Sequence, residues 1–188
     1  LLDAVRVWQR GQGLRAYDTR KQEGFLRALL VREGKRTGER MVVLITSPGD
    51  FDRAGFVSAV RSAYPATSIQ RGISNAGSEV SFAEELEVLE GAPWIYEELH
   101  LETLGGRSLR FRISPMSFFQ TNTLATERLY GRIREWAHHT QCPTLHDLYG
   151  GAGGIAFSCS DLVEQVWSVE TVAAASEEDL RRRGRPDR

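Results

Sequence analysis

The glycine-rich segment DLYGGAGGIAF, residues 147–157, has the composition of a ligand-binding loop. Four of its residues between positions 150 and 154 are glycines, and the absence of a Cβ lets a backbone approach a ligand closely. Asp147 stands before the loop, and Glu170 follows Gly151 by 19 positions. A carboxylate at about this offset can accept hydrogen bonds from the hydroxyls of a ribose. The spacing therefore indicates a nucleotide-type cofactor.

The segments around the loop indicate how it is positioned. Residues 144–150 are predicted to form a strand, a helix is predicted from about residue 153, and residues 165–170 form a second strand. This order is a βαβ unit, in which the helix start offers N–H groups to a ligand. A dinucleotide would require a third glycine where Ala156 stands, although the relaxed motif accepts alanine. S-adenosylmethionine and a packing turn without ligand are the other two interpretations, and the loop alone leaves all three open.

The preceding part of the chain has the pattern of an α+β domain. Residues 2–10 and a segment that begins after Asp52 have helical periodicity, and Asp52 has the character of an N-cap. Strand-like runs are expected to form a mainly antiparallel sheet, and residues 79–90 fit either a strand or a helix. The expected strands are residues 25–32, 40–46, 67–74, 94–100 and 109–113.

A longer helix is predicted from residue 121 or 123 to about His138, with Thr121 or Asn122 as its cap. Its predicted buried stripe contains Leu124, Leu129, Ile133, Trp136 and Ala137.

Composition and charge set limits on the class of protein. The 188 residues are 41% hydrophobic and 26% charged, with no apolar run long enough to span a membrane. Two cysteines and four histidines show no metal-ligand spacing, and free thiols favour a cytoplasmic location. The net charge is −1, but residues 1–40 carry ten Lys and Arg against five Asp and Glu. A basic N-terminal part is compatible with RNA binding or with an unevenly solvated surface.

Three sequence blocks resemble the RNA uracil-5-methyltransferase family, which makes 5-methyluridine in transfer and ribosomal RNA from S-adenosylmethionine. The block S-x-x-x-F-x-Q-x-N of that family is matched by residues 114–122, and the loop D-L-[YF]-C-G-x-G by residues 147–153. A third block, Y-D…G-x-L-R-x-x-x-x-R, is matched by residues 17–32. The resemblance covers residues of about 1–170 and selects S-adenosylmethionine among the three interpretations of the loop. An unrelated dinucleotide-dependent oxidoreductase would leave the FFQTN block unexplained.

The resemblance implies roles for individual residues. Gln120 would contact the cofactor or the target uracil, Tyr149 would line the cofactor pocket, and Glu170 would bind the ribose. Gly151 and Gly153 would form the cofactor loop. Arg27 and Arg32 would face RNA, with solvated strand arginines as the alternative interpretation. Phe118 and Phe119 are expected to anchor the core rather than to stack on bases.

This chain departs from the family at two loop positions. Gly150 stands where the family usually has cysteine, and Gly154 stands where it often has asparagine or threonine. The loss of a side-chain donor at position 154 is expected to weaken cofactor binding.

The activity that the resemblance implies is transfer of a methyl group to carbon 5 of uracil. A cysteine thiolate attacks carbon 6, and the enolate so formed takes the methyl group. The family places this cysteine and a D-P-P-R-x-G segment well after the loop, and neither is matched here. Cys159 is expected to be a buried small side chain and Cys142 has no evident activation, so no catalytic residue is assigned. The expected function is that of a catalytically incomplete methyltransferase, with a non-catalytic RNA-binding module of a truncated paralogue as the alternative.

The expected fold class is α/β overall. An α+β antiparallel-sheet domain, residues 1–112, would precede the start of a Rossmann-like methyltransferase domain, residues 113–188, truncated after its second strand. Ser176 and Asp179 have the pattern of a helix cap before an arginine-rich end. Parallel sheets are normally covered on both faces, so the truncated sheet is expected to drive self-association.

Overall fold

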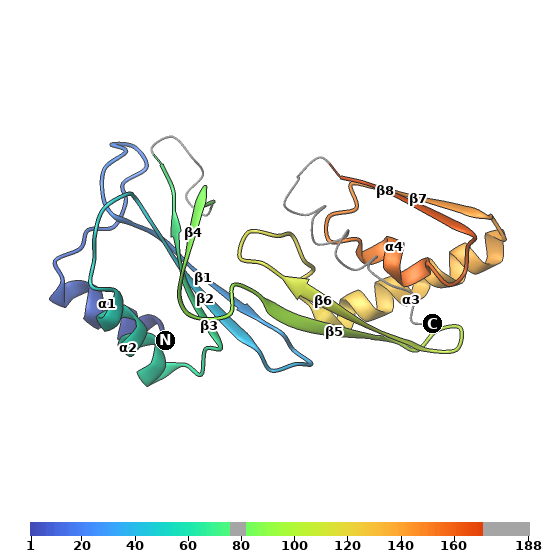
Figure 1. Ribbon diagram of the computed structural model, residues 1–188, viewed down its shortest axis with the longest axis horizontal. Helices are drawn as coiled ribbons and strands as arrows, with labels where there is room; N and C mark the ends of the chain where they lie inside the picture. The colour runs from blue at the N-terminus through green and yellow to red at the C-terminus, as the bar shows by residue number, and fades with distance from the viewer. Residues whose placement is uncertain (76–81, 171–188) are drawn as a thin grey trace. The chain divides into compact units, whose positions relative to one another are not determined.

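The computed structural model describes residues 1–75 and 82–170 (Figure 1). The chain forms two compact units, which are described separately. The first unit contains Leu1–Gly34, Gly38–Ile95 and Ser114–Met116, and the second contains Lys35–Thr37, Tyr96–Ile113 and the chain from Ser117 onward. The domain boundary after residue 112 remains a prediction, while packing groups Tyr96–Ile113 with the segment that follows.

The first unit is built on a four-stranded sheet in the order β1-β2-β3-β4. The strands are β1 (Leu26–Glu33), β2 (Arg40–Thr46), β3 (Ser68–Ile73) and β4 (Glu85–Gly91). The predicted β1–β2 hairpin is confirmed, and the ambiguous segment 79–90 contributes strand β4.

The expectation of an antiparallel sheet in the first unit is wrong at one pair of strands. Strands β2 and β3 are parallel, with Met41 opposite Ser68 and Thr46 opposite Ile73, so the sheet is mixed. Helix α2 (Arg53–Ala63) connects these two strands and returns the chain to the end of the sheet at which β2 begins. Such a crossover is what parallel neighbours require, because a tight turn joins only antiparallel strands.

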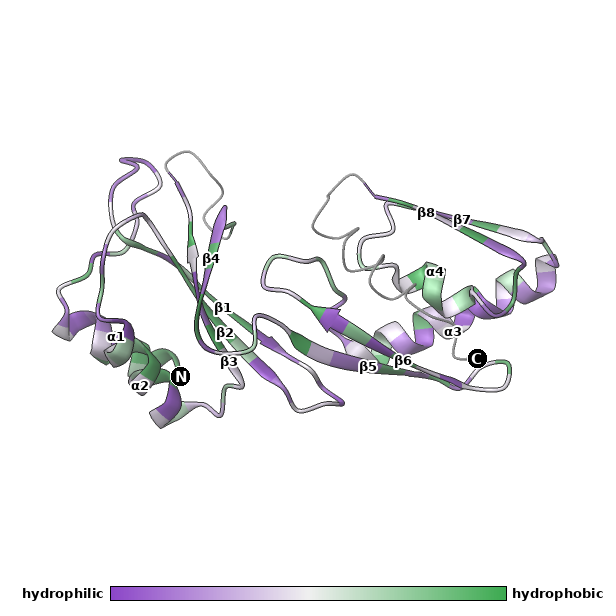
Figure 2. Ribbon diagram, viewed as in Figure 1, coloured by the Kyte–Doolittle hydropathy of each residue, from purple (hydrophilic) through white to green (hydrophobic). Residues whose placement is uncertain are grey.

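Helices α1 (Leu2–Gly11) and α2 pack with strands β2 and β3 to form the core of the first unit. Val5 and Trp8 of α1 pack with Phe56 and Val60 of α2, and the Trp8 and Phe56 ring centroids are 5.2 Å apart. Figure 2 shows the corresponding green hydrophobic colouring on α2 and on the central strands. The Asp52 side chain accepts a hydrogen bond from the Gly55 N–H, which confirms the predicted cap.

The second unit contains two pairs of strands and two helices. Strands β5 (Ile95–Leu101) and β6 (Arg107–Ile113) pair with each other, and α3 (Thr123–Thr140) follows them. Strand β7 (Thr144–Leu148), helix α4 (Gly154–Cys159) and parallel strand β8 (Gln165–Val169) form the predicted βαβ unit. Leu99, Leu101, Phe111 and Tyr130 form the buried cluster that joins β5 and β6 to α3.

The buried face of α3 differs from the predicted one. Leu124, Leu129 and Trp136 are 52%, 48% and 62% exposed, so the predicted apolar stripe is wrong at these three positions. Ile133, a fourth member of the stripe, does pack against the buried cluster. The residues that α3 buries are mostly polar or small: Thr123, Thr126, Tyr130, Gly131 and Arg134. The helix begins after Asn122, whose side chain accepts from the Ala125 N–H, which decides between the two candidate caps.

Polar partners explain why this face of α3 is buried. The carboxylate of Glu97 on β5 is 1% exposed and accepts from the Thr123 hydroxyl at 2.5 Å. The same carboxylate accepts from the backbone N–H groups of Lys35 and Arg36 at 2.7 and 2.9 Å. Buried polar groups are tolerated when they are hydrogen-bonded in this way. The start of α3 is therefore fixed to β5 and to residues 35–36.

The later part of α3 is held by a buried arginine. The Arg134 side chain is fully buried and donates to both carboxylate oxygens of Asp161, at 2.6 and 2.9 Å, and to the Ser158 carbonyl. The hydrogen bonds from Arg134 lower the pKa of Asp161 from its ordinary range to about 2. A charge pair therefore connects α3 to the segment around α4.

The outer face of the β7–β8 pair carries exposed apolar side chains. Leu148, Trp167 and Val169 are 64%, 59% and 53% exposed, and Leu148 is paired with Val169 in the strand register. Self-association through this face remains a prediction. The helix predicted near Ser176, with Asp179 and the arginine-rich end, lies outside the described residues. In the described ranges, no helix has both the length and the apolarity that crossing a bilayer would require.

Candidate cofactor site

The glycine loop between β7 and α4 makes a tight turn with repeated left-handed backbone conformations. Gly151 and Gly153 have φ values of 56° and 73°, which glycine adopts without a steric penalty. Tyr149 has φ of 60°, an uncommon value for a residue with a side chain, and the residue is 85% exposed. The Gly153 N–H donates to the Gly150 carbonyl at 2.8 Å. The loop therefore has a defined conformation that presents Tyr149 at the surface.

Two carboxylates hold the loop from either side. Asp147 is buried and accepts from the Ala156 N–H at 3.0 Å, which connects the end of β7 to α4. Glu170, just after β8, accepts from the Gly151 N–H at 2.8 Å. The parallel pairing of β7 with β8 brings Glu170 to this loop, because the carboxyl ends of both strands lie at one edge.

A cavity of about 180 Å³ opens between the loop and the segment before α3. Gln120, Tyr149 and Gly151, three of the five predicted cofactor residues, line it together. The other two do not line it: Gly153 is buried in the turn, and Glu170 is hydrogen-bonded to the lining residue Gly151. The other side chains and glycines that line the cavity include Phe118, Phe119, Tyr130, Asp147, Gly154 and Ile155.

The two phenylalanines of the FFQTN block have different environments. Phe119 packs on Phe111 with ring centroids 5.4 Å apart, which confirms its role in the core. Phe118 is 71% exposed and lines the cavity, so the expectation that it anchors the core is wrong. Although the two residues are adjacent in the chain, only Phe119 packs into the core.

Tyr130 is a cavity residue that sequence reasoning did not identify. The predicted apolar stripe of α3 contained Leu129 instead of the adjacent Tyr130, because helical periodicity alone does not distinguish between the two positions. The burial of Thr126 and Arg134, four residues before and after Tyr130, places all three on one face of α3. Burial of that face depends on the partners of Arg134 and Thr123, which lie far away in the sequence.

The two departures from the family pattern correspond to crowded positions. A Cβ at Gly150 would clash with the Ser168 hydroxyl and lie 3.3 Å from the Asp147 carboxylate. A Cβ at Gly154 would clash with the Tyr130 hydroxyl and lie 2.9 Å from its Cζ atom. In this chain, glycine at positions 150 and 154 leaves room for the Ser168 and Tyr130 side chains.

Substitution of Gly150 by alanine is expected to lower the free energy of unfolding by about 1 kcal/mol, because the new methyl group would overpack the space beside Ser168. Chemical denaturation would measure the change. Gly11→Ala in α1 is the matched control, since no atom lies within 4 Å of the added methyl group. Ser168→Ala should relieve most of the cost of Gly150→Ala, and equal costs in both backgrounds would contradict this explanation.

The two arginines predicted to face RNA lie on β1 of the first unit. The Arg27 side chain is buried, donates to the Ser74 hydroxyl at 2.9 Å and stacks 3.8 Å from the centre of the Tyr17 ring. Arg27 is therefore not a solvated strand residue, and its guanidinium has partners within the unit. Arg32 is half-buried. Contact of either arginine with RNA remains a prediction.

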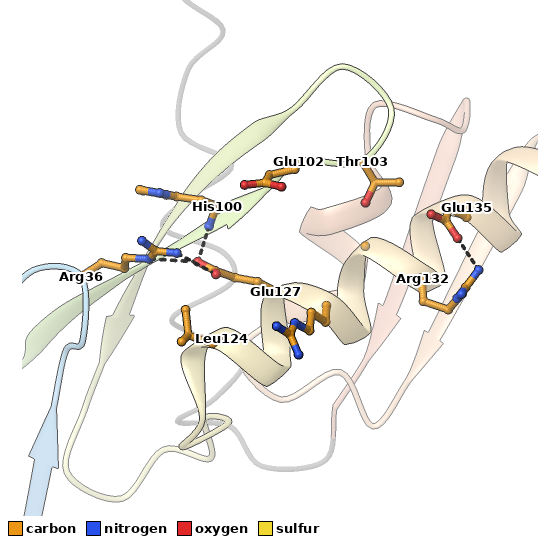
Figure 3. A pocket seen from close by; sticks show the side chains of 10 residues that line it. Arg36, His100, Glu102, Thr103, Leu124, Glu127, Arg132 and Glu135 are labelled. Atoms are coloured by element: carbon orange, nitrogen blue, oxygen red, sulfur yellow. Dashed lines mark hydrogen bonds and ion pairs between the residues drawn. The ribbon is translucent and has the colours of Figure 1, made fainter.

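A second cavity in the second unit, about 450 Å³ in volume, is lined mainly by charged side chains. Figure 3 shows Glu127 of α3 between Arg36 and His100, with the Arg36 guanidinium bonded to both carboxylate oxygens at 3.1 and 2.8 Å. Burial acts to raise the pKa of Glu127, but hydrogen bonds from Arg36 and the His100 N–H lower it overall. Arg132 also pairs with Glu135. Because its charges largely neutralise one another, this cavity is a weaker candidate for a cofactor site.

Neither cysteine lines the loop cavity. Cys159 in α4 is buried, and burial raises the pKa of its thiol. The expectation of a buried small side chain is therefore confirmed for Cys159. Cys142 is exposed in the segment after α3.

Comparison with known proteins identifies relatives over most of the chain. No protein-family model matches it. An uncharacterized RNA methyltransferase of Caldanaerobacter subterraneus is 35% identical over 165 residues, which cover 85% of this chain and 35% of that protein. Another, of Halalkalibacterium halodurans, is 34% identical over 173 residues, which cover 91% of this chain and 36% of that protein. The chain thus spans about a third of the length of these relatives.

A solved structure shares the fold. The crystal structure of Pyrococcus abyssi tRNA (uracil-54, C5)-methyltransferase in complex with S-adenosyl-L-homocysteine matches with a TM-score of 0.71 and 25% sequence identity. The match covers 95% of this chain and 41% of that one. The fold is therefore that of part of a methyltransferase. Together with the sequence relatives, this match confirms the resemblance to the RNA uracil-5-methyltransferase family.

Proposed function

From the premise that this chain is homologous to part of RNA methyltransferases, we propose that its glycine-loop cavity binds S-adenosylmethionine. We further propose that the whole protein methylates carbon 5 of a uracil in transfer or ribosomal RNA. The observation that carries the cofactor site is the hydrogen bond between Glu170 and Gly151 beside a cavity that Gln120 and Tyr149 line.

The residues around the cavity fit this cofactor chemically. The Glu170 carboxylate, at the end of β8, is the acceptor for the ribose hydroxyls. Tyr149 and Phe118 offer aromatic surface, and Gly151 and Gly153 shape a backbone that a ligand can approach closely. Gln120 supplies an amide that can both donate and accept hydrogen bonds. S-adenosylmethionine, when bound, would supply the methyl group for transfer.

We assign binding, but no catalytic residue, to the 188 residues. Cys159 is buried with a raised thiol pKa, which disfavours the thiolate that nucleophilic catalysis needs. The 188 residues by themselves are expected to bind the cofactor without methylating RNA. The proposed partner is transfer or ribosomal RNA in the cytoplasm, with Arg27 and Arg32 as proposed RNA contacts.

Calorimetry with S-adenosylhomocysteine would test the cofactor site. Glu170→Gln is expected to weaken binding by about tenfold or more, because a charged hydrogen-bond acceptor contributes about 1.5–3 kcal/mol. Glu164→Gln is the matched control, as Glu164 lies close in sequence and lines a different surface. Equal affinities of the unsubstituted chain and Glu170→Gln would contradict the assignment of Glu170.

The second candidate function is a non-catalytic RNA-binding module, which the excess of basic residues in positions 1–40 favours. This function requires RNA affinity that falls steeply as salt rises, because bound phosphates release counterions. Salt-sensitive RNA binding together with no detectable binding of S-adenosylhomocysteine would favour this candidate over the methyltransferase.

A further inference from the structure

Tyr130 occupies the inner wall of the loop cavity. Its side chain belongs to the buried cluster with Leu99, Leu101 and Phe111, and the residue is only 7% exposed. The ring ends against Gly154, whose missing side chain leaves the space that the Tyr130 hydroxyl and Cζ atom fill. The core thus fixes the ring, while its polar end lies at the cofactor loop.

The hydroxyl of Tyr130 is available to a ligand. In the described part of the chain, it forms no hydrogen bond, although the residue lines the cavity with Gln120 and Gly151. Burial, and then the negative charge of Asp147, raise the pKa of Tyr130 above its ordinary value. The phenol therefore keeps its proton at neutral pH and can act as a hydrogen-bond donor. Buried tyrosine hydroxyls usually have a partner, so an unpaired hydroxyl on a residue that lines the cavity points to a ligand.

We propose that Tyr130 is a cofactor-contacting residue, whose hydroxyl hydrogen-bonds to S-adenosylmethionine from the place that a side chain at position 154 would otherwise fill. This inference rests on the proposed cofactor function of the loop. It explains how the loop can carry glycine at position 154 and still offer a side-chain donor to the ligand. The donor comes from α3 instead of from the loop itself.

Tyr130→Phe tests the proposal, because it removes the hydroxyl and keeps the ring that fills the core. Calorimetry should show binding of S-adenosylhomocysteine weakened by about three- to tenfold, the range expected for one neutral hydrogen bond. Tyr64→Phe is the matched control: Tyr64 also has a pKa raised by burial, but it lies in the first unit. This control should leave the affinity unchanged.

A second measurement follows the phenol itself. Absorbance at high pH should reveal a late-titrating tyrosine that Tyr130→Phe lacks, and saturating S-adenosylhomocysteine should move its titration to still higher pH. The shift on ligand binding is measured on a chain that keeps Tyr130, and Tyr64→Phe removes the other tyrosine whose pKa burial raises, so the readout holds even if Tyr130→Phe folds poorly.

The outcomes separate the two proposals. Unchanged affinity in Tyr130→Phe, or a phenol titration that the ligand does not move, would overturn the role of Tyr130 and leave the cofactor site standing. Absence of binding by the unsubstituted chain would overturn the cofactor site and the role of Tyr130 with it.

Discussion

Replacement of Glu97 by alanine is expected to lower the free energy of unfolding by about 4 kcal/mol, because several buried donors would lose their acceptor together. The Glu97 carboxylate accepts from the Thr123 hydroxyl and from the N–H groups of Lys35, Arg36 and Glu98. Each donor left unsatisfied costs about 1–3 kcal/mol where water cannot replace the acceptor. Chemical denaturation, followed by circular dichroism, would measure the loss.

Glu98→Ala is the matched control for Glu97→Ala. Glu98 is the next residue of the same strand, but its side chain is 39% exposed and lies 3.6 Å from His100. An exposed pair of this kind contributes about 1 kcal/mol at most, so the control should be nearly as stable as the unsubstituted chain. Similar losses for the two variants would show that Glu97 does not organise the start of α3.

Asp161→Asn is the second substitution with a large expected effect. Asparagine removes the negative charge and one of the two acceptor oxygens, so the fully buried Arg134 would keep neutral acceptors but lose its charged partner. Loss of one partner from a buried pair costs about 3–5 kcal/mol, and we expect about 2 kcal/mol here because Asp161 is 40% exposed. Arg132, whose pair with Glu135 is exposed, provides the control: Glu135→Gln should change stability little.

The contribution of Asp161 should also depend on pH. Its pKa is about 2 in the folded chain, below the value of about 3.9 for an unfolded chain. The folded state therefore binds the proton less readily, and the stabilisation is present above about pH 4 and lost as the pH falls through 2. The difference in unfolding free energy between the unsubstituted chain and Asp161→Asn should shrink over this interval. A difference that stays constant down to pH 2 would contradict the Arg134–Asp161 account.

Both substitutions bear on the proposed cofactor site through α3. This helix carries Tyr130 to the cavity, and Gln120 lies just before its Asn122 cap. Glu97 fixes the start of the helix, and Arg134 fixes it four residues after Tyr130. We therefore expect loss of either contact to weaken cofactor binding as well as stability.

Local features of the structure were predictable from the sequence. The Asp52 cap, the β1–β2 hairpin and the β7–α4–β8 unit depend on short-range preferences: side-chain capping, strand alternation and glycine in a left-handed turn. The resemblance to a methyltransferase family depends on equally short sequence motifs, and the relatives and the shared fold confirm it. The direction of β3 was not predictable in this way, because it depends on how α2 returns the chain.

The glycine loop, the two carboxylates beside it and the family resemblance can be recognised from the residue order alone, since each is a pattern of residue types at fixed spacing. The buried face of α3, in contrast, depends on contacts between distant parts of the chain. Arg134 and Thr123 are buried because Asp161 and Glu97, 27 and 26 residues away in sequence, satisfy their polar atoms. That choice of face turns Tyr130 toward Gly154, and periodicity along the helix carries no information about such distant partners.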